Sequence, residues 1–502
     1  MKKTITYAAG LSLLLVGASS CNRELLTPIP QTSVSDASAF STVNRVQTQL
    51  LSLYGASNTV NGYGGLKEGN FYGGRIVVYG DIRGEDFINE TSNLITGSDV
   101  WALNPTNSTT AVQNLWFYAY QTINKCNIFL DGMAAGGSTI VGADAAGRYI
   151  AEAKLIRALS YYSLLQFYAR PYVDGNGNKP GVPLRLNGIK SAGQSNLARS
   201  TVAEVYAQVL KDMNEAEAAL PATYTAASDN VTRAHKNTAI ALKTRVYLSM
   251  QRYADVITEA NKIVSATAPF KAPTGVAHQL QADITTVFYT NYLTSESIFS
   301  LPMTSTVGDY PTTQNQLAYY FSPTQANGGV GNGEYSLNAR GIVAEPTWLA
   351  TDKRRGFIKT SGTGTSAKIW LNKYKAPSPY TDYVPVIRYA EVLLNLAEAK
   401  VRSTTTVDAQ AVALLAAVRS RSDATTTYTA SSFATATDLA NAILLERRIE
   451  FLGEGLRNND LMRLLQTIPA KGSVPAKSPN DSGYIWPISS TELNLNASAT
   501  DN

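Results

Sequence analysis

The chain has 502 residues, of which 44% are hydrophobic and 16% charged, a composition typical of a large globular protein with a lightly charged surface. Its formal net charge is +5 and no block of Lys or Arg occurs, which argues against binding to nucleic acid. After the first twenty residues no stretch approaches the length of about 18 apolar residues that a membrane-spanning helix needs.

The start of the chain has the pattern of an export signal. Two lysines precede a short apolar run, which four small residues (Gly17–Ser20) follow. This order predicts a secretory signal peptide over residues 1–20, since the apolar run is too short to cross a bilayer. Cys21 comes next, so the start resembles a bacterial lipoprotein signal, in which that cysteine is acylated; an ordinary signal peptide is the alternative. Residues 21–36, polar with two prolines, are predicted to form a lipidated tether.

The first part of the mature chain mixes a helix with a long irregular insertion. Residues 37–54 have helical periodicity. Residues 55–110 are rich in Gly, Asn, Ser and Thr, interleaved with aromatic residues, and we expect them to form loops. A long insertion without secondary structure is usually functional or disordered, and the aromatic residues favour function.

Helical patterns dominate the rest of the chain. We expect a helix over 143–168 and another that begins at a capping box of Thr201 and Glu204. Residues 235–265 and 389–420 each resemble a tetratricopeptide hairpin, two antiparallel helices that need neighbours to bury their faces. Residues 270–380 are loop-rich, with short strand-like runs such as Ser297–Leu301. The predicted fold is mainly α, a helical-repeat scaffold with loop-rich portions in a single domain over 37–502.

Cysteine and tryptophan positions suggest core packing. If Cys21 is acylated, Cys126 has no partner within the chain, and its helical surroundings predict a small buried residue. Trp116, Trp370 and Trp486 are also expected in the core, whereas Trp348 is undecided.

Two charged clusters could be mistaken for active sites. Asp81, Glu85, Asp86 and Glu90 could in principle hydrolyse a glycoside or bind Ca²⁺. We favour hydrogen bonds that organise the loop, and predict no cofactor. Residues 446–463 are crowded with Glu and Arg at helical spacing, and there we expect a structural ion-pair network rather than catalysis. The only two histidines lie 43 residues apart and have no metal-binding pattern.

A ligand site is predicted from aromatic residues beside polar ones. A sugar ring packs its C–H face on an aromatic ring, while its hydroxyls bond to planar polar groups. Trp101 and Asn104 supply both kinds of group within the 55–110 insertion, and three more residues precede them there: Tyr79, Asp81 and Arg83. Trp101 is the strongest single candidate.

Several segments together resemble one family. The resemblance is to SusD/RagB-type lipoproteins, and four segments carry it: EAKLIRA (152–158), RYAEVLLNLAEA (388–399), ERRIEFLGEGLRNNDLMR (446–463) and WPISSTELNLN (486–496). The lipoprotein-like start fits as well. One departure is the stretch directly after Cys21, where Glu24 is the only acidic residue although surface-exported members often carry several.

The resemblance implies a function and completes the predicted site. Such proteins are nutrient-binding lipoproteins of Bacteroidetes-type outer membranes, anchored by lipid and facing the cell exterior. They are not enzymes; they close as a lid on a SusC-like TonB-dependent transporter and capture oligosaccharides or, in some members, peptides. Starch-binding members use a second aromatic loop, which here would hold Tyr310, Tyr319 and Tyr320. A peptide-binding member, a surface glycosidase and a purely protein-binding scaffold are the alternatives.

Overall fold

The computed structural model describes residues 36–55, 64–191, 193, 196–289, 291–311 and 314–502. The predicted signal peptide, Cys21 and all but the last residue of the tether lie outside these residues. Helices dominate, so the mainly α prediction is confirmed. Within the described part of the chain, no helix combines the length and apolar character needed to span a membrane.

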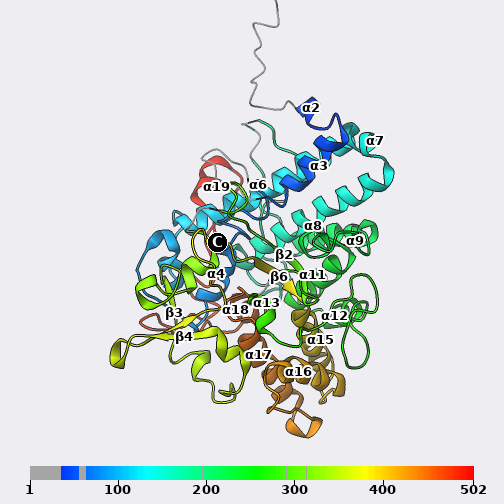
Figure 1. The fold of residues 1–502 in the computed structure, drawn as a ribbon. Coiled ribbons are helices and arrows are strands. Elements are labelled where there is room, and N and C mark those ends of the chain that lie inside the picture. Colours follow the sequence, from blue (N-terminus) through cyan, green and yellow to red (C-terminus); the bar gives the residue numbers. More distant parts are fainter. Residues whose placement is uncertain (1–35, 56–63, 192, 194–195, 290, 312–313) are drawn as a thin grey trace, which may run out of the picture.

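A series of packed helices forms the scaffold. Consecutive members contact one another, and Figure 1 shows them along one side of the molecule, opposite the loop-rich portion that contains α4, β3 and β4. The scaffold helices are α6 (Thr110–Gly132), α8 (Ala143–Tyr168), α9 (Val202–Ala219), α11 (Lys236–Ser249), α12 (Tyr253–Ala260), α15 (Tyr389–Ser403), α16 (Ala409–Ser422) and α17 (Ala436–Glu450).

The strongest sequence signals are confirmed. α8 has the predicted bounds, and α9 begins at the capping box, in which Glu204 N–H donates to Thr201 Oγ1 and Thr201 N–H donates to Glu204 Oε2. The two predicted hairpins are α11–α12 and α15–α16, and α15 also packs on α12, which joins them into one repeat array.

One prediction for the N-terminal part is confirmed only in part, and the other is wrong. Residues 37–54 form two helices, α2 (Asp36–Ala39) and α3 (Val43–Ser52), because Thr42 adopts an extended conformation and caps α3 through Arg45 N–H. The 55–110 insertion contains α4 (Arg75–Ile82), β1 (Phe87–Asn89), η3 (Leu94–Thr96) and α5 (Ser98–Trp101).

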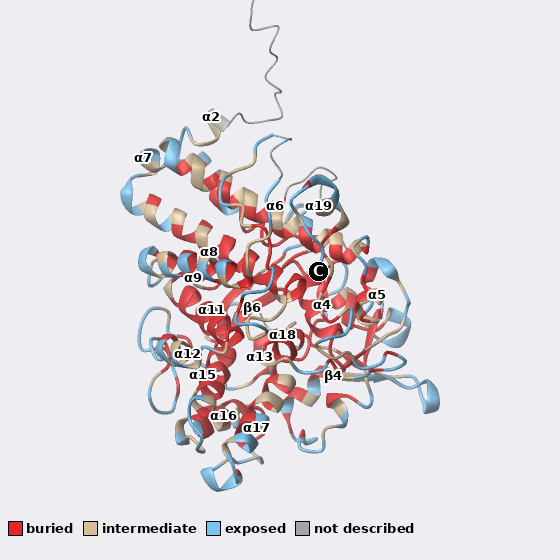
Figure 2. Cartoon of the chain, turned by 180° about the vertical axis from the view of Figure 1, so that it is seen from behind, coloured by how far each residue is buried: buried red, intermediate tan, exposed pale blue. Residues whose placement is uncertain are grey.

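α4 is a buried helix rather than a loop. Every residue from Gly64 to Phe87 except Asn70 is buried, and Figure 2 shows α4 in the interior. Gly80 makes this possible, since a Cβ there would lie 2.1 Å from the carbonyl oxygen of Gly455. The close contact of two backbones joins α4 to the segment that follows α17.

The loop-rich portion contains two small antiparallel sheets. One has the strand order β1-β3-β5-β4, and the other pairs β2 with β6. β2 matches the predicted strand, and the strand bounds are β2 (Ser297–Leu301), β3 (Tyr335–Leu337), β4 (Ile358–Ser361), β5 (Lys368–Leu371) and β6 (Val384–Arg388).

The remaining elements are short. They are the π-helical η4 (Met133–Gly137), the α-helices α7 (Ser138–Val141), α10 (Asp229–Thr232), α13 (Thr285–Tyr289), α14 (Leu317–Phe321), α18 (Arg457–Met462) and α19 (Ser490–Leu495), and the 3₁₀ helices η5 (Gln325–Asn327), η6 (Ile342–Ala344), η7 (Lys353–Phe357), η8 (Gly364–Ser366) and η9 (Ala430–Ser432).

One large hydrophobic cluster runs through both the scaffold and the loop-rich portion. Cys126 is fully buried in it, and burial raises the pKa of its thiol to about 12. Trp116, Trp370 and Trp486 are buried as predicted, and so is Trp348.

Candidate ligand-binding site

Half of the predicted site residues lie in the interior. Tyr79, Asp81, Arg83 and Tyr320 are each at most 2% exposed. Asp81 accepts a bond of 3.0 Å from Gly455 N–H, and burial raises its pKa to about 7. Since these four side chains have almost no surface to offer, in this structure they support the fold beneath a site rather than contact a ligand.

Trp101 is half-buried and its polar group is already bonded. Its Nε1–H donates to Phe87 O at 2.7 Å, and its ring lies against Gly472. Asn104 is exposed. Gly472, which neighbours both the indole and Ile88, lines a cleft of about 960 Å³ together with Ile88 and charged residues such as Arg340.

A second group of aromatic residues lies nearer the surface. Tyr319, on α14, packs edge-to-face on Tyr380 with ring centroids 5.7 Å apart, and both side chains are half-buried. Tyr380 has a left-handed backbone (φ +61°), a strained conformation that often marks ligand-binding positions. Tyr310 is also half-buried.

Carboxamides lie beside these rings. Asn70, the only residue of its segment that reaches the surface, accepts bonds from Arg75 Nη1 at 2.7 Å and from Asn114 Nδ2 at 3.2 Å. Arg75 Nη2 lies 3.5 Å from the carbonyl oxygen of Gln314, whose residue is exposed. Asn70 and the main chain of Gln314 therefore contact one buried guanidinium, and Asn114 bonds to Asn70.

Tyr118 completes the group from α6. It lies one helical turn after Asn114, and Arg75 is close enough to affect the pKa of both Tyr118 and Tyr319. Burial raises both pKa values, so these phenols stay neutral and can donate hydrogen bonds. We call Tyr118, Tyr319 and Tyr380, with the three carboxamides, the tyrosine surface.

The loops that carry this surface are held together tightly. Lys67 Nζ donates to Pro302 O at 2.9 Å and pairs with Asp309. A Cβ at Gly74 would lie 1.8 Å from Asn315 O, so only glycine allows this contact.

The tyrosine surface continues into a groove. Asn114 and Phe117 line a hollow of about 910 Å³ that follows α6 as far as Phe129. Phe117 is 52% exposed, and Gln113, Gln121 and Asn124 add further carboxamides to its walls. The volume is of the size that binding sites for small ligands have.

The 81–90 carboxylates are engaged within the protein. Glu85 pairs with Arg457, Asp86 with Arg448 and Glu90 with Lys368, in addition to the bond of Asp81. No group of three or more metal-ligating side chains was found in the described part of the chain.

The charged 446–463 segment forms a buried ion-pair network, as predicted. Glu450 accepts bonds from Arg354, Arg388 and Arg421 at 2.9, 3.0 and 2.6 Å, and Glu446 pairs with Arg354 and Arg419. Arg447 and Arg463 share Asp460. These contacts join β6, α16 and α17.

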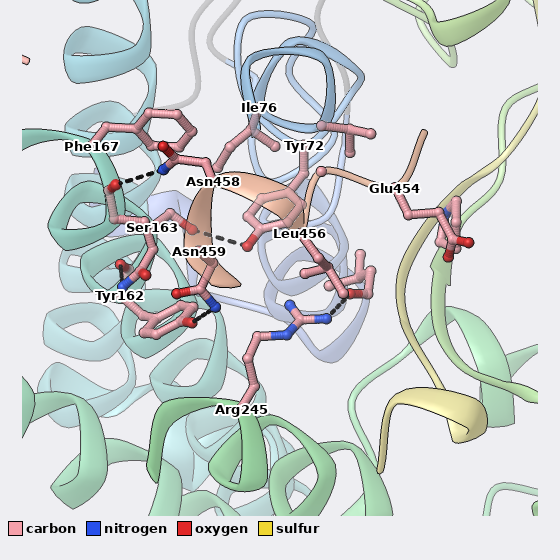
Figure 3. A pocket seen from close by; sticks show the side chains of 15 residues that line it. Tyr72, Ile76, Tyr162, Ser163, Phe167, Arg245, Glu454, Leu456, Asn458 and Asn459 are labelled. Carbon is pink, nitrogen blue, oxygen red and sulfur yellow. Dashed lines mark hydrogen bonds between the residues drawn. The ribbon is translucent and has the colours of Figure 1, made fainter. Parts of the chain in front are cut away.

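A small cavity lies where the scaffold meets this segment (Figure 3). Its volume is about 60 Å³, enough for about two water molecules and too small for a sugar ring. Tyr72 Oη and Ser163 Oγ lie 2.9 Å apart in its wall, and Asn459 donates to Tyr162 Oη at 3.0 Å. We assign it a structural role.

The sequence indicated Tyr319 but not its partners. Asn70, Asn114, Tyr118, Gln314 and Tyr380 come from four distant parts of the chain, and nothing in their local sequence shows that they meet. One signal was available on α6, where Asn114, Tyr118 and Gln121 recur at helical spacing and therefore lie on one face.

Comparisons with known proteins agree over most of the chain. A family model described as "Starch-binding associating with outer membrane" matches residues 58–248, and one described as "SusD family" matches residues 350–502. A SusD superfamily protein from Bacteroides fragilis is similar in structure, with 33% identity and a TM-score of 0.78; the match covers 92% of this chain and 99% of that one.

Two further structures show the same fold. A SusD superfamily protein from Bacteroides thetaiotaomicron has 24% identity and a TM-score of 0.77, and a laminarin-binding SusD-like protein has 20% and 0.66; both matches cover 92% of this chain and 99% of the other. Curated protein sequences gave no match.

Proposed function

The chain belongs to the SusD family, and from that membership we propose that it captures an oligosaccharide at the outer membrane and delivers it to a SusC-like TonB-dependent transporter. SusD family proteins are binding proteins, and we extend this to the present chain: it binds its ligand without chemical change. Acylation of Cys21 would hold it on the membrane, facing the cell exterior, and incorporation of labelled palmitate tests that step.

The tyrosine surface is the observation that carries this proposal. Tyr118, Tyr319 and Tyr380 offer rings for the C–H faces of sugars, and the neighbouring carboxamides can donate to and accept from hydroxyl groups. The groove along α6 gives an oligosaccharide room to extend beyond the first sugar. A peptide could use the same groups, so peptide binding is the alternative outcome.

Titration calorimetry of the full-length chain in detergent, against neutral oligosaccharides, acidic oligosaccharides and peptides, tests the proposal. Tyr380→Ala should weaken oligosaccharide binding at least tenfold, because the ring is part of the contact surface. Tyr428→Ala is the matched control, since Tyr428 is also half-buried against another ring but lies between α16 and α17. No product should appear during the titration.

The same titration separates the two candidate surfaces. Trp101 remains a predicted ligand contact beside the charged cleft, and Trp101→Ala is measured in parallel. Loss of binding in Trp101→Ala alone would move the site to that cleft. Tight peptide binding without sugar binding would contradict the proposed ligand class.

A further inference from the structure

Two buried arginines have no carboxylate partner among the described residues, and one of them, Arg75, lies near the surface. Nine arginines are buried among the described residues. Seven have a carboxylate oxygen within 2.9 Å: Arg157, Arg245, Arg354, Arg388, Arg419, Arg447 and Arg463. Arg75 and Arg83 have none within the 4.0 Å that defines an ion pair among the described residues.

Arg75 contacts only neutral acceptors. Its Nε–H donates to Tyr320 Oη at 2.9 Å, its Nη1 to Asn70 Oδ1 at 2.7 Å, and its Nη2 only weakly to Gln314 O at 3.5 Å. A guanidinium stays protonated in proteins, and a buried charge without a counter-ion is costly. Seven of the nine buried arginines in the described chain offset this cost by pairing with a carboxylate, whereas Arg75 and Arg83 do not.

Arg83 provides the internal comparison. It is 1% exposed and bonds to Asn458 Oδ1 at 2.8 Å and to the carbonyl oxygens of Tyr484 and Gly483 at 2.5 and 3.3 Å. These partners tie the C-terminal segment to α4, which is a structural role. The Nη atoms of Arg75 instead reach two residues of the surface, Asn70 and Gln314.

Acidic side chains close to the tyrosine surface do not supply the missing charge. Glu334 is buried and affects the pKa of Tyr319, but its carboxylate accepts from Thr96 Oγ1 at 2.6 Å, from Asn332 Nδ2 at 2.5 Å and from Thr91. Glu68 is buried near Tyr118. Neither forms an ion pair with Arg75.

We propose that the ligand of the tyrosine surface is an acidic oligosaccharide, and that a uronic acid carboxylate on it is the counter-ion of Arg75. This inference rests on the proposed function and narrows its ligand class. A guanidinium forms charge-assisted hydrogen bonds with a carboxylate. Although Arg75 is only 4% exposed, its Nη2 makes a single long bond, to the exposed residue Gln314, and is the donor that a ligand can use. The rings of Tyr319 and Tyr380 would hold the neighbouring sugar face.

Matched ligands test the charge directly. The full-length chain is titrated with hexamers of galacturonate, mannuronate and hyaluronate, each beside its neutral methyl ester, and with a sulfated carrageenan hexamer. We expect at least one uronate to bind at least tenfold more tightly than its own ester, and this preference to shrink at high salt. Tighter binding of the sulfated sugar than of every uronate would overturn the carboxylate assignment.

Asn70→Asp supplies the missing counter-ion within the protein. The carboxylate keeps both acceptor bonds that Asn70 Oδ1 makes, and no bond donated by Asn70 is lost among those described. The variant should melt at a higher temperature and lose the preference for the acid over the ester. Asn70→Ala is the control, because it removes the amide without neutralising Arg75 and should keep the preference.

The outcomes separate this inference from the proposed function. Binding of neutral and acidic sugars with equal affinity, or an acid preference that survives Asn70→Asp, would overturn the inference and leave oligosaccharide capture intact. Binding of peptides and of no saccharide, acidic or neutral, would overturn both.

Discussion

Glu450→Gln tests whether the 446–463 network holds the fold together. The side chain is 1% exposed and contacts three guanidinium groups. At an effective dielectric constant of about 20, one charge pair about 4 Å apart is worth about 4 kcal/mol. The variant loses three such attractions but no longer has to bury a carboxylate, and the amide oxygen still accepts. Removing one partner of a buried pair typically costs about 3–5 kcal/mol, and we expect that loss here.

Urea denaturation at pH 7 measures this loss as a fall in the free energy of unfolding. Asp255→Asn is the control, because Asp255 pairs with Arg252 at 2.7 Å but both side chains are well exposed (39% and 44%) and the pair is screened by solvent. Its loss should stay below about 1 kcal/mol. Equal losses for the two variants would refute the role assigned to the network.

The pH dependence of the stability difference between the wild-type chain and Glu450→Gln gives a second check on the role of the network. Burial opposes ionisation of Glu450, but Arg421, Arg388 and Arg354 outweigh it and lower its pKa below the usual value. An acid with a lowered pKa contributes stability above its unfolded-state pKa and loses that stability as the pH falls through its folded-state pKa. The gap between the wild-type chain and Glu450→Gln should therefore stay constant from pH 8 to pH 5. A gap that closes within this range would contradict the assignment.

Two further substitutions test the packing of α4. Burial raises the pKa of Asp81 from 3.8 to about 7, so the stability that its neutral form provides is lost as the pH rises through about 7. The free energy of unfolding of Asp81→Asn should therefore exceed that of the wild-type chain by an amount that grows from pH 5 to pH 8, to at most about 4 kcal/mol. A difference independent of pH would refute this. Gly80→Ala should lower the free energy of unfolding by at least about 1–3 kcal/mol, because its Cβ would lie 2.1 Å from Gly455 O. Gly147→Ala, where a Cβ would meet no atom within 4 Å, should raise it by about 0.5–1 kcal/mol. Urea denaturation measures both changes, and the same sign for both would contradict the packing of α4.

The helical scaffold was predictable because its signals are local. α8 has a long apolar period, and Thr201 and Glu204 bond within one helical turn, so both can be read from a short window of sequence. α4 was missed because its apolar run carries no helical period: all eight residues are buried, on every face, and glycines flank and interrupt it.

The site was only partly predictable, because whether a side chain points to the surface or to the interior is decided by tertiary structure. Tyr319 and Tyr320 are adjacent in sequence, yet Tyr319 reaches the surface while Tyr320 is fully buried and bonded to Arg75. Similarly, Asp81 and Arg83 looked like ligand contacts because they are polar, but they bond to Gly455 and Asn458 inside the protein. Which polar groups are already satisfied cannot be seen before the chain is folded.

The four segments that resemble the family in sequence and the tyrosine surface consist of different residues. The segments that identify the family supply Arg388, Glu446 and Glu450 to a buried network, where no ligand reaches them. The tyrosine surface lies outside the four segments that resemble the family in sequence. It is built on α6, α14 and neighbouring loops, which the Lys67–Asp309 pair and the contact of Gly74 with Asn315 O hold together. A change in the network is therefore expected to act on stability, and a change at Asn70 or Tyr380 on the ligand. Because Arg75 has no counter-ion among the described residues, we propose that its charge is what distinguishes acidic from neutral sugars at this surface.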